Sequence, residues 1–167
     1  VLIEELLAVD RGEALNRQEL LTALSDSSHP AAAEQALMVV WDPAVDRDSL
    51  RLAAGILASA GDTENAEQAL LASVEGLEPP PRAAENAALA AYEWGSYQVS
   101  AELALRAIGE RPHHGSAYAI RAAARIRLGE TEPAAADVAH FLEIADDRRS
   151  GLLLVAEAYL AAGHGVA

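Results

Sequence analysis

The side chains able to do chemistry in this 167-residue chain are histidines, arginines and carboxylates, because Cys and Lys are both absent. Without Cys there is no thiolate nucleophile and no disulfide, and without Lys there is no Schiff base and no P-loop cation. The sequence also lacks a glycine-rich phosphate loop and a G-x-S-x-G nucleophile elbow. These features predict a protein that is not an enzyme and that uses no cofactor.

The histidines do not have the spacing of a metal site. A helical zinc site places two of them four residues apart on one helix face, and no pair in the chain has that spacing. The five positions are His29, His113, His114, His140 and His164. We expect all five on the surface and no bound metal.

Acidic residues dominate the charge, since 26 Asp and Glu face 12 Arg, for a formal net charge of −14. Such a surface lacks the clustered cations that bind nucleic acid or anionic lipid. No apolar run approaches the roughly 18 residues of a membrane span, so direct membrane insertion is not expected. The remaining partner class is protein or peptide. A Lys-free chain rich in Ala and Arg is typical of a high-GC bacterium, and bacterial cytoplasm and periplasm both tolerate a Cys-free chain.

Glycines recur every 34 residues, at Gly61, Gly95, Gly129 and Gly163. A constant period of this length indicates stacked helix–turn–helix units. In each unit one helix is expected to run up to the glycine, and a second helix is expected to leave it.

Three further columns agree when the glycine is numbered position 15 of each unit. Position 8 holds Leu20, Ala54, Ala88, Ala122 and Ala156, position 20 holds Ala32, Ala66, Ser100 and Ala134, and position 28 holds Val40, Val74, Ile108 and Leu142. Small residues at positions 8 and 20 let two helices cross closely. The aliphatic column suits the contact with the next unit.

These columns resemble the tetratricopeptide repeat family, with small residues at positions 8 and 20, glycine at 15 and an aliphatic residue at 28. The unit at 81–114 is among the best matches. There Gly95-Ser96-Tyr97 is similar to the family's glycine–polar–tyrosine turn, and Ala107 and Pro112 fall at its small and proline positions. The resemblance is specific for fold and not for function.

The resemblance implies an all-α fold: a right-handed superhelical solenoid of antiparallel helix pairs, with about four repeats plus flanking half-repeats. The expected divisions are 1–12 as the end of a preceding repeat helix, 13–46 as repeat 1, 47–80 as repeat 2, 81–114 as repeat 3, 115–148 as repeat 4 and 149–167 as the first helix of a further repeat. Repeat 1 is degenerate, since Ser27 replaces its glycine. We expect one continuous array that is a fragment of a longer protein, because both ends fall within a unit.

In the family the first helices of the units line a concave groove, so the resemblance implies a partner-binding surface there. The residues at the groove positions mix aliphatic, aromatic and charged side chains, which suits a bound peptide or helix. They are Asp48, Arg51, Arg82, Glu85, Leu89, Tyr92, Glu93, Ile126, Arg127, Leu153 and Glu157.

Arg121 and Arg125 fall at positions 7 and 11, on the normally buried face of their helix. A buried cation is costly unless it is paired. Asp137, on the second helix of the same unit, is placed to accept a bond from at least one of them. We therefore expect an internal Arg–Asp contact rather than a ligand site. Trp41 and Trp94 are expected to be half-buried between units.

The leading hypothesis is a non-catalytic protein–protein interaction scaffold that binds a partner peptide or helix in the concave groove. Its expected setting is a bacterial multiprotein assembly, of which envelope and exopolysaccharide secretion complexes are one example. Two alternatives stay open. One is a regulatory or spacer module within a larger enzyme or sensor, and the other is an array that self-associates through exposed ends.

Overall fold

A computed structural model of the chain describes residues 15–26, 31–42, 44–75, 82–145 and 148–163. Within these ranges all regular structure is α-helical and there is no strand. The expectation of an all-α fold is therefore confirmed for the described part of the chain. The helix expected within 1–12, together with His29 and His164, lies outside the described residues.

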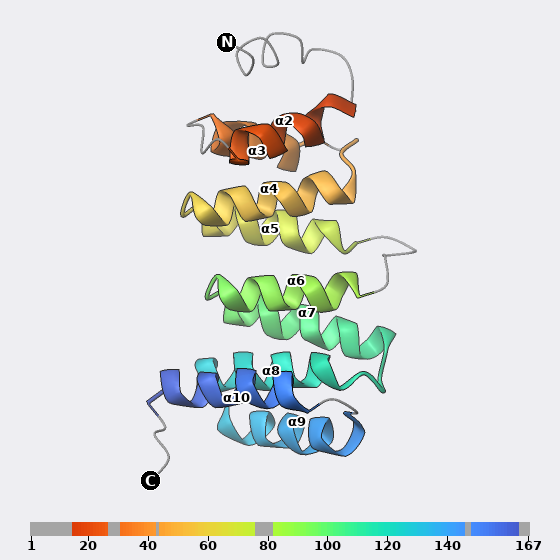
Figure 1. Cartoon of the computed structure of the whole chain (residues 1–167), viewed down its shortest axis with the longest axis vertical. Helices are drawn as coiled ribbons and strands as arrows, with labels where there is room; N and C mark the ends of the chain where they lie inside the picture. Colours follow the sequence, from red (N-terminus) through yellow and green to blue (C-terminus); the bar gives the residue numbers. More distant parts are fainter. Residues whose placement is uncertain (1–14, 27–30, 43, 76–81, 146–147, 164–167) are drawn as a thin grey trace. The chain divides into compact units, whose positions relative to one another are not determined.

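The helices form two compact units that divide between Glu75 and Gly76. The first unit contains α2 (Leu15–Asp26), α3 (Ala32–Val40), α4 (Arg47–Ser59) and α5 (Thr63–Ser73). The second contains α6 (Ala83–Glu93), α7 (Tyr97–Glu110), α8 (Gly115–Leu128), α9 (Thr131–Ile144) and α10 (Arg149–Ala161) (Figure 1). In the first unit α4 packs on α2, α3 and α5, and in the second unit α8 packs on α6, α7, α9 and α10. Each unit is therefore built around one central helix.

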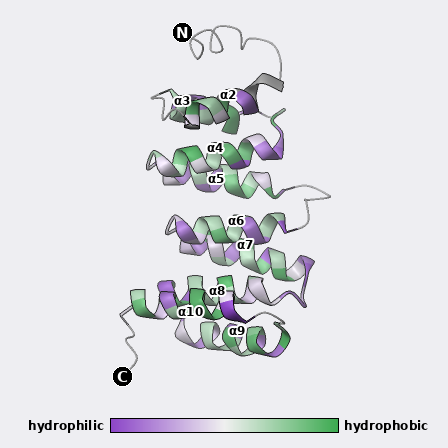
Figure 2. Ribbon diagram, viewed as in Figure 1, coloured by the Kyte–Doolittle hydropathy of each residue, from purple (hydrophilic) through white to green (hydrophobic). Residues whose placement is uncertain are grey.

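Apolar and polar residues alternate along the helices rather than gathering in any single one (Figure 2). Alanine is the most frequent residue of the buried core. Small side chains bury little area, at about 25 cal/mol per Å², so the few large core residues contribute disproportionately to stability. None of the helices in the described ranges combines the length and the apolar character needed to cross a bilayer.

The repeating glycines end one helix and turn the chain toward the next. Gly61, Gly95 and Gly129 follow α4, α6 and α8, and their φ angles lie between 81° and 85°. A residue without Cβ adopts this left-handed conformation without steric cost. In each turn the glycine N–H donates to the carbonyl three residues earlier and the next N–H donates to the carbonyl five residues earlier, at 2.9–3.1 Å. This Schellman pattern satisfies the last carbonyls of the helix, and it confirms the turn expected at each glycine.

Small residues occupy the crossing between each of these first helices and the second helix that follows it. The pairs without exposed surface are Ala54 with Ala66, Ala88 with Ser100, and Ala122 with Ala134. The Ser100 hydroxyl donates to the Ala88 carbonyl at 2.8 Å, which satisfies the polar member of this set. A larger side chain in either column would push the two helices apart.

Ala156 departs from its column, because it is exposed in α10. No second helix follows α10 among the described residues. Leu152, one turn earlier on the same face of α10, is 43 % exposed.

Trp94 is half-buried, as expected, but Trp41 is 69 % exposed. Trp41 follows the last residue of α3, outside the buried face of that helix.

Phe141 is the largest fully buried side chain of the described core. It belongs to α9, and a glycine on α10 leaves room for its ring. A Cβ on Gly151 would overlap Phe141 Cζ, and it would lie 2.7 Å from Phe141 Cε2 and 3.0 Å from the Cβ of Ala119 on α8. The ring therefore locks α8, α9 and α10 together at a point where only glycine fits.

Replacing Gly151 with Ala should destabilise the second unit by about 1–3 kcal/mol, because the added methyl group forces the Phe141 ring out of its packed position. Chemical denaturation followed by circular dichroism measures the change. Gly109→Ala in α7 is the control, since an added Cβ there meets nothing within 4 Å, and it should be neutral or stabilise by up to about 1 kcal/mol. Equal effects of the two substitutions would contradict this account of the packing.

Candidate functional site

A hollow of about 370 Å³ lies between α6, α8 and α10 in the second unit, and we call it the trough. Its lining consists of Glu85, Asn86 and Leu89 from α6, Ser116, Ala119 and Ile120 from α8, and Ser150, Gly151, Leu153, Leu154 and Glu157 from α10. Ala119 and Ile120 are buried and form its floor, whereas Leu89 and Leu153 are 37 % and 55 % exposed. Exposed leucines beside an apolar floor indicate a surface on which another molecule can bury area.

The charged residues of the trough lining are two carboxylates that lie at opposite corners. Glu85 is in the first turn of α6, four residues before Leu89, whereas Glu157 follows Leu153 by four residues on α10. Residues four apart lie on the same helix face. Because α6 and α10 run in the same direction (Figure 1), an acid on one helix is level with a leucine on the other.

Four side chains form a hydrogen-bonded chain at the end of the trough where α8 begins. An Arg82 guanidinium nitrogen lies 3.1 Å from His114 Nε2, so in the neutral ring this nitrogen accepts. The ring proton is then on Nδ1, which donates to Ser116 Oγ at 2.8 Å. The Ser116 hydroxyl in turn donates to Glu85 Oε1 at 2.7 Å. His114 is therefore a partly buried link between α6 and α8, and the expectation that it is a surface residue is wrong.

This order of bonds does not activate the serine as a nucleophile. In a Ser–His–acid triad the histidine accepts the serine proton, and the acid holds the other ring nitrogen. Here the His114 ring donates to Ser116, and Arg82, a cation, occupies the far nitrogen. The cluster fixes the geometry of the trough rim instead, because each member holds the next in one orientation.

Two tyrosines and a cation lie beside the Glu157 corner of the trough. The Tyr92 and Tyr97 rings are 5.5 Å apart, and the Arg127 guanidinium lies over the Tyr97 ring at 4.5 Å. Burial raises the pKa of the Tyr92 phenol, the Arg127 cation works against that rise, and the Glu157 carboxylate adds to it. Tyr92 is thus a half-buried residue beside the lining, and its raised pKa keeps it protonated at neutral pH.

Asp48 and Arg51 line a separate hollow in the first unit, between α2 and α4. Their side chains are 59 % and 54 % exposed and form an ion pair at 2.9 Å. Exposed pairs contribute only about 0–1 kcal/mol, so this one is a weak surface contact. The structure places these two expected groove residues in the first unit, and it places the trough in the second.

The other expected groove residues lie in the trough, at its edge, in the core or outside all of these. Glu85, Leu89, Leu153 and Glu157 line the trough, and Arg82 is at its rim. Ile126, expected in the groove, is only 1 % exposed and belongs to the core around Phe141, because α9 and α10 cover that side of α8. Glu93 is exposed in the last turn of α6 and is not part of the lining.

Three lining residues that the sequence analysis did not assign to the groove share position 6 of their units. They are Asn86, Ile120 and Leu154. Position 6 lies one helical turn after position 2, where Ser116 and Ser150 are found. The helical period of 3.6 residues places these two positions on one face, so extending the face by one column would have found them.

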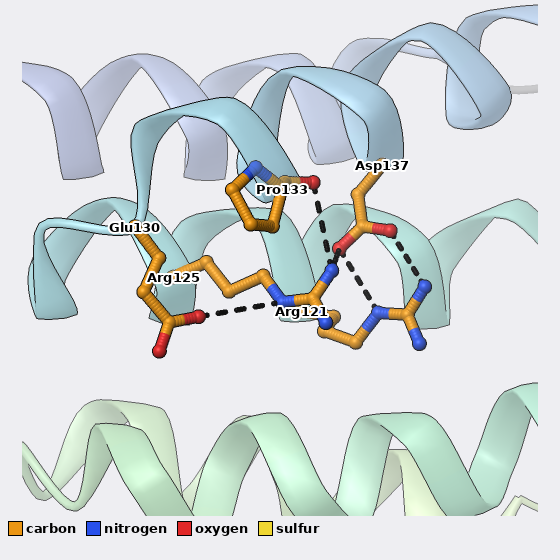
Figure 3. Close-up of polar contacts among 5 residues, drawn as sticks. All are labelled: Arg121, Arg125, Glu130, Pro133 and Asp137. Atoms are coloured by element: carbon orange, nitrogen blue, oxygen red, sulfur yellow. Dashed lines mark hydrogen bonds and ion pairs between the residues drawn. The ribbon is translucent and has the colours of Figure 1, made fainter.

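Asp137 holds two arginines of α8 in the interior of the second unit (Figure 3). Its side chain is 5 % exposed, and its oxygens accept from Arg121 at 2.9 Å and 2.6 Å and from Arg125 at 2.7 Å. Arg125 also approaches the Pro133 carbonyl at 3.5 Å and Glu130 at 3.7 Å. The expected internal Arg–Asp contact is present, and the carboxylate reaches both cations rather than one.

The described residues include no group of three or more His, Asp or Glu side chains placed to hold a metal ion. Comparison of the chain with protein-family models, with curated proteins and with solved structures gives no match. We therefore infer function from the geometry of each unit.

Replacing Asp137 with Ala should destabilise the second unit by about 1–3 kcal/mol, because two largely buried guanidinium groups lose their shared acceptor. Urea denaturation measures the loss. Glu130→Gln is the matched control, since the Glu130 side chain is 48 % exposed and lies farther from Arg125, and its cost should stay below about 1 kcal/mol. An unchanged midpoint in the Asp137 variant would show that the pairing does not support the fold.

Proposed function

We propose that this chain is a non-catalytic protein-interaction scaffold whose trough holds a peptide or helix of a partner protein. The observation that carries the proposal is the pair of exposed leucines, Leu89 and Leu153, on either side of the buried Ile120. An apolar floor between two helices with a polar rim is the common form of a groove that accepts a helix or an extended segment.

The proposed architecture is a tetratricopeptide-like solenoid of antiparallel helix pairs. Three features support it: the left-handed glycines at the 34-residue period, the small residues buried at positions 8 and 20, and the packing of α6, α8 and α10 around one hollow. Chains of this kind stack units so that each covers the apolar face of its neighbour. The first helices are then left free to line a binding surface.

The proposed role does not involve catalysis. Ser116, His114 and Glu85 lie together at the rim, but their hydrogen bonds run in the direction opposite to that of a nucleophilic triad. A bacterial multiprotein assembly, such as an envelope or exopolysaccharide secretion complex, is the proposed setting. A regulatory or spacer module of a larger enzyme or sensor is the alternative setting for the same trough.

Self-association is a second candidate function, favoured by the exposed face of α10. Ala156 is exposed, whereas its counterparts Ala54, Ala88 and Ala122 are fully buried. In those three units a second helix covers the small residue. A helix from another copy of the chain could cover Ala156 and Leu152 in the same way.

A photo-crosslinking amino acid at position 153 should capture a partner in cells that make the protein, because this side chain projects from the trough wall. p-Benzoylphenylalanine in place of Leu153 is compared with the same residue in place of Leu105. Leu105 is on α7, outside the trough, and both leucines are 55 % exposed. Non-specific crosslinking should therefore be equal at the two positions.

We expect one discrete crosslinked species from position 153 and none from position 105, identified by mass spectrometry. Equal capture at both positions, or no specific capture at position 153, would rule out the trough as the partner-binding surface. Thermal unfolding of the two variants checks that each has kept its fold.

Sedimentation velocity tests self-association through α10. The net charge of −14 opposes contact between copies at low salt, and raising the salt to about 1 M screens that repulsion. If copies pair through the Ala156 face, a dimer should grow with protein and salt concentration and disappear in Ala156→Glu. A strict monomer under all these conditions would exclude this candidate.

A further inference from the structure

We propose that the segment held in the trough is basic as well as apolar, with Leu- or Ile-sized side chains flanked by Lys or Arg. This inference rests on the proposed function and names the chemistry of the partner. It follows from the charge of the trough lining, its shape, and the way the neighbouring cations are already engaged.

Glu157 is the more exposed of the two carboxylates in the trough lining. Its side chain is exposed at the trough wall, one turn after Leu153, and among the described residues it makes no hydrogen bond or ion pair. Glu85 supplies the second negative charge of the lining, at the other end. The lining contains no cation, so a bound segment meets only carboxylates and neutral groups.

The arginines near the trough already have partners, so no arginine forms an ion pair with Glu157 among the described residues. Arg127 stacks on Tyr97 at 4.5 Å, and its guanidinium forms no ion pair within 4.0 Å among the described residues. Arg82 donates to His114. Arg111 is 4.0 Å from Glu85 and compensates that carboxylate in part. Glu157 is therefore the stronger of the two anchors for an incoming cation.

The positions of Glu85 and Glu157 determine the order of basic and apolar residues expected in the bound segment. α6 presents acid then leucine along its sequence, and α10 presents leucine then acid, with Ile120 between them on the floor. A segment crossing the trough therefore meets an acid, an apolar centre and a second acid. The complementary order is a basic residue, one or two large apolar residues, and a basic residue.

Charge also favours a different protein over a second copy of this chain as the occupant. Each copy carries a formal net charge of −14 and no Lys, so a second copy would bring like charge to the exposed Glu157 and to Glu85, whose side chain is 13 % exposed. Like charges brought together at an interface oppose binding and suppress wrong partners. A partner with a basic amphipathic segment is attracted by the carboxylates of the trough lining, whereas a second copy of this chain is repelled by them.

Fluorescence anisotropy with three synthetic peptides tests the inference on the whole chain. The peptides share one apolar core, Ala-Leu-Leu-Ala, flanked on each side by Lys, by Gln or by Glu. At about 150 mM salt, where distant charges are largely screened, the Lys peptide should bind at least about tenfold more tightly than the Gln peptide, and the Glu peptide most weakly.

Variants separate the trough from the overall negative charge. Glu157→Gln should weaken binding of the Lys peptide about three- to fivefold and leave binding of the Gln peptide unchanged. Glu102→Gln removes one exposed acid from α7, outside the lining, and should change binding less than about twofold. Glu157→Lys should reverse the preference, so that the Glu peptide binds more tightly than the Lys peptide. Leu153→Glu should weaken binding of the Gln peptide, whereas Leu105→Glu should leave that binding unchanged.

Equal binding of the Lys and Gln peptides, or equal effects of the Glu157 and Glu102 substitutions, would overturn the inference. Occupancy of the trough by a second copy, detected as loss of dimer in Leu153→Glu but not in Leu105→Glu, would also overturn it. If crosslinking at position 153 captures a partner segment without basic residues, the scaffold function stands and this inference fails. If neither crosslinking nor any peptide detects binding, both fail.

Discussion

The structure depends on helices crossing so closely that only small residues fit between them. At the crossing of α6 and α7, Ala88 and Ser100 are fully buried, and the Ser100 hydroxyl bonds directly to the Ala88 carbonyl. Such a contact joins side chain to backbone of the neighbouring helix, so the two helices cannot separate without exposing a polar group. On α6 and α8 this crossing face is separate from the face that lines the trough.

An alanine-rich core makes a few other contacts unusually important. Each buried alanine removes little apolar area from water, so Phe141 supplies much of the bulk that joins α8, α9 and α10, and Gly151 makes room for it. Asp137 connects α9 to α8 by another route, through two guanidinium groups. A buried charge cluster adds little net stability compared with apolar packing, but it strongly penalises any arrangement that separates its members. It therefore favours one register between α8 and α9.

The same packing accounts for the character of the trough. Its floor is rigid because α8 is covered by α7, α9 and α10, and its rim is held by the bonds from Arg82 through His114 and Ser116 to Glu85. Its walls carry exposed side chains, among them Leu89, Leu153 and Glu157. A fixed floor with adaptable walls suits recognition of a segment that is ordered on binding, since the surface itself has little freedom to lose. The proposed function and the proposed basic character of the ligand both come from this combination.

The sequence by itself determined the local features: the turns at Gly61, Gly95 and Gly129, the small columns, and the Arg–Asp pairing across α8 and α9. Each of these follows from a conformational or packing requirement of residues within one 34-residue unit, so a periodic pattern is enough to find it. Only the tertiary structure decided which groove positions are accessible. Ile126 and Leu153 look alike in sequence, but α9 and α10 bury the first and leave the second at the trough wall. Likewise, nothing in the sequence around His114 predicts its bond to Arg82 or the bond of Ser116 to Glu85, because both depend on how α6 and α8 pack across a separation of about thirty residues.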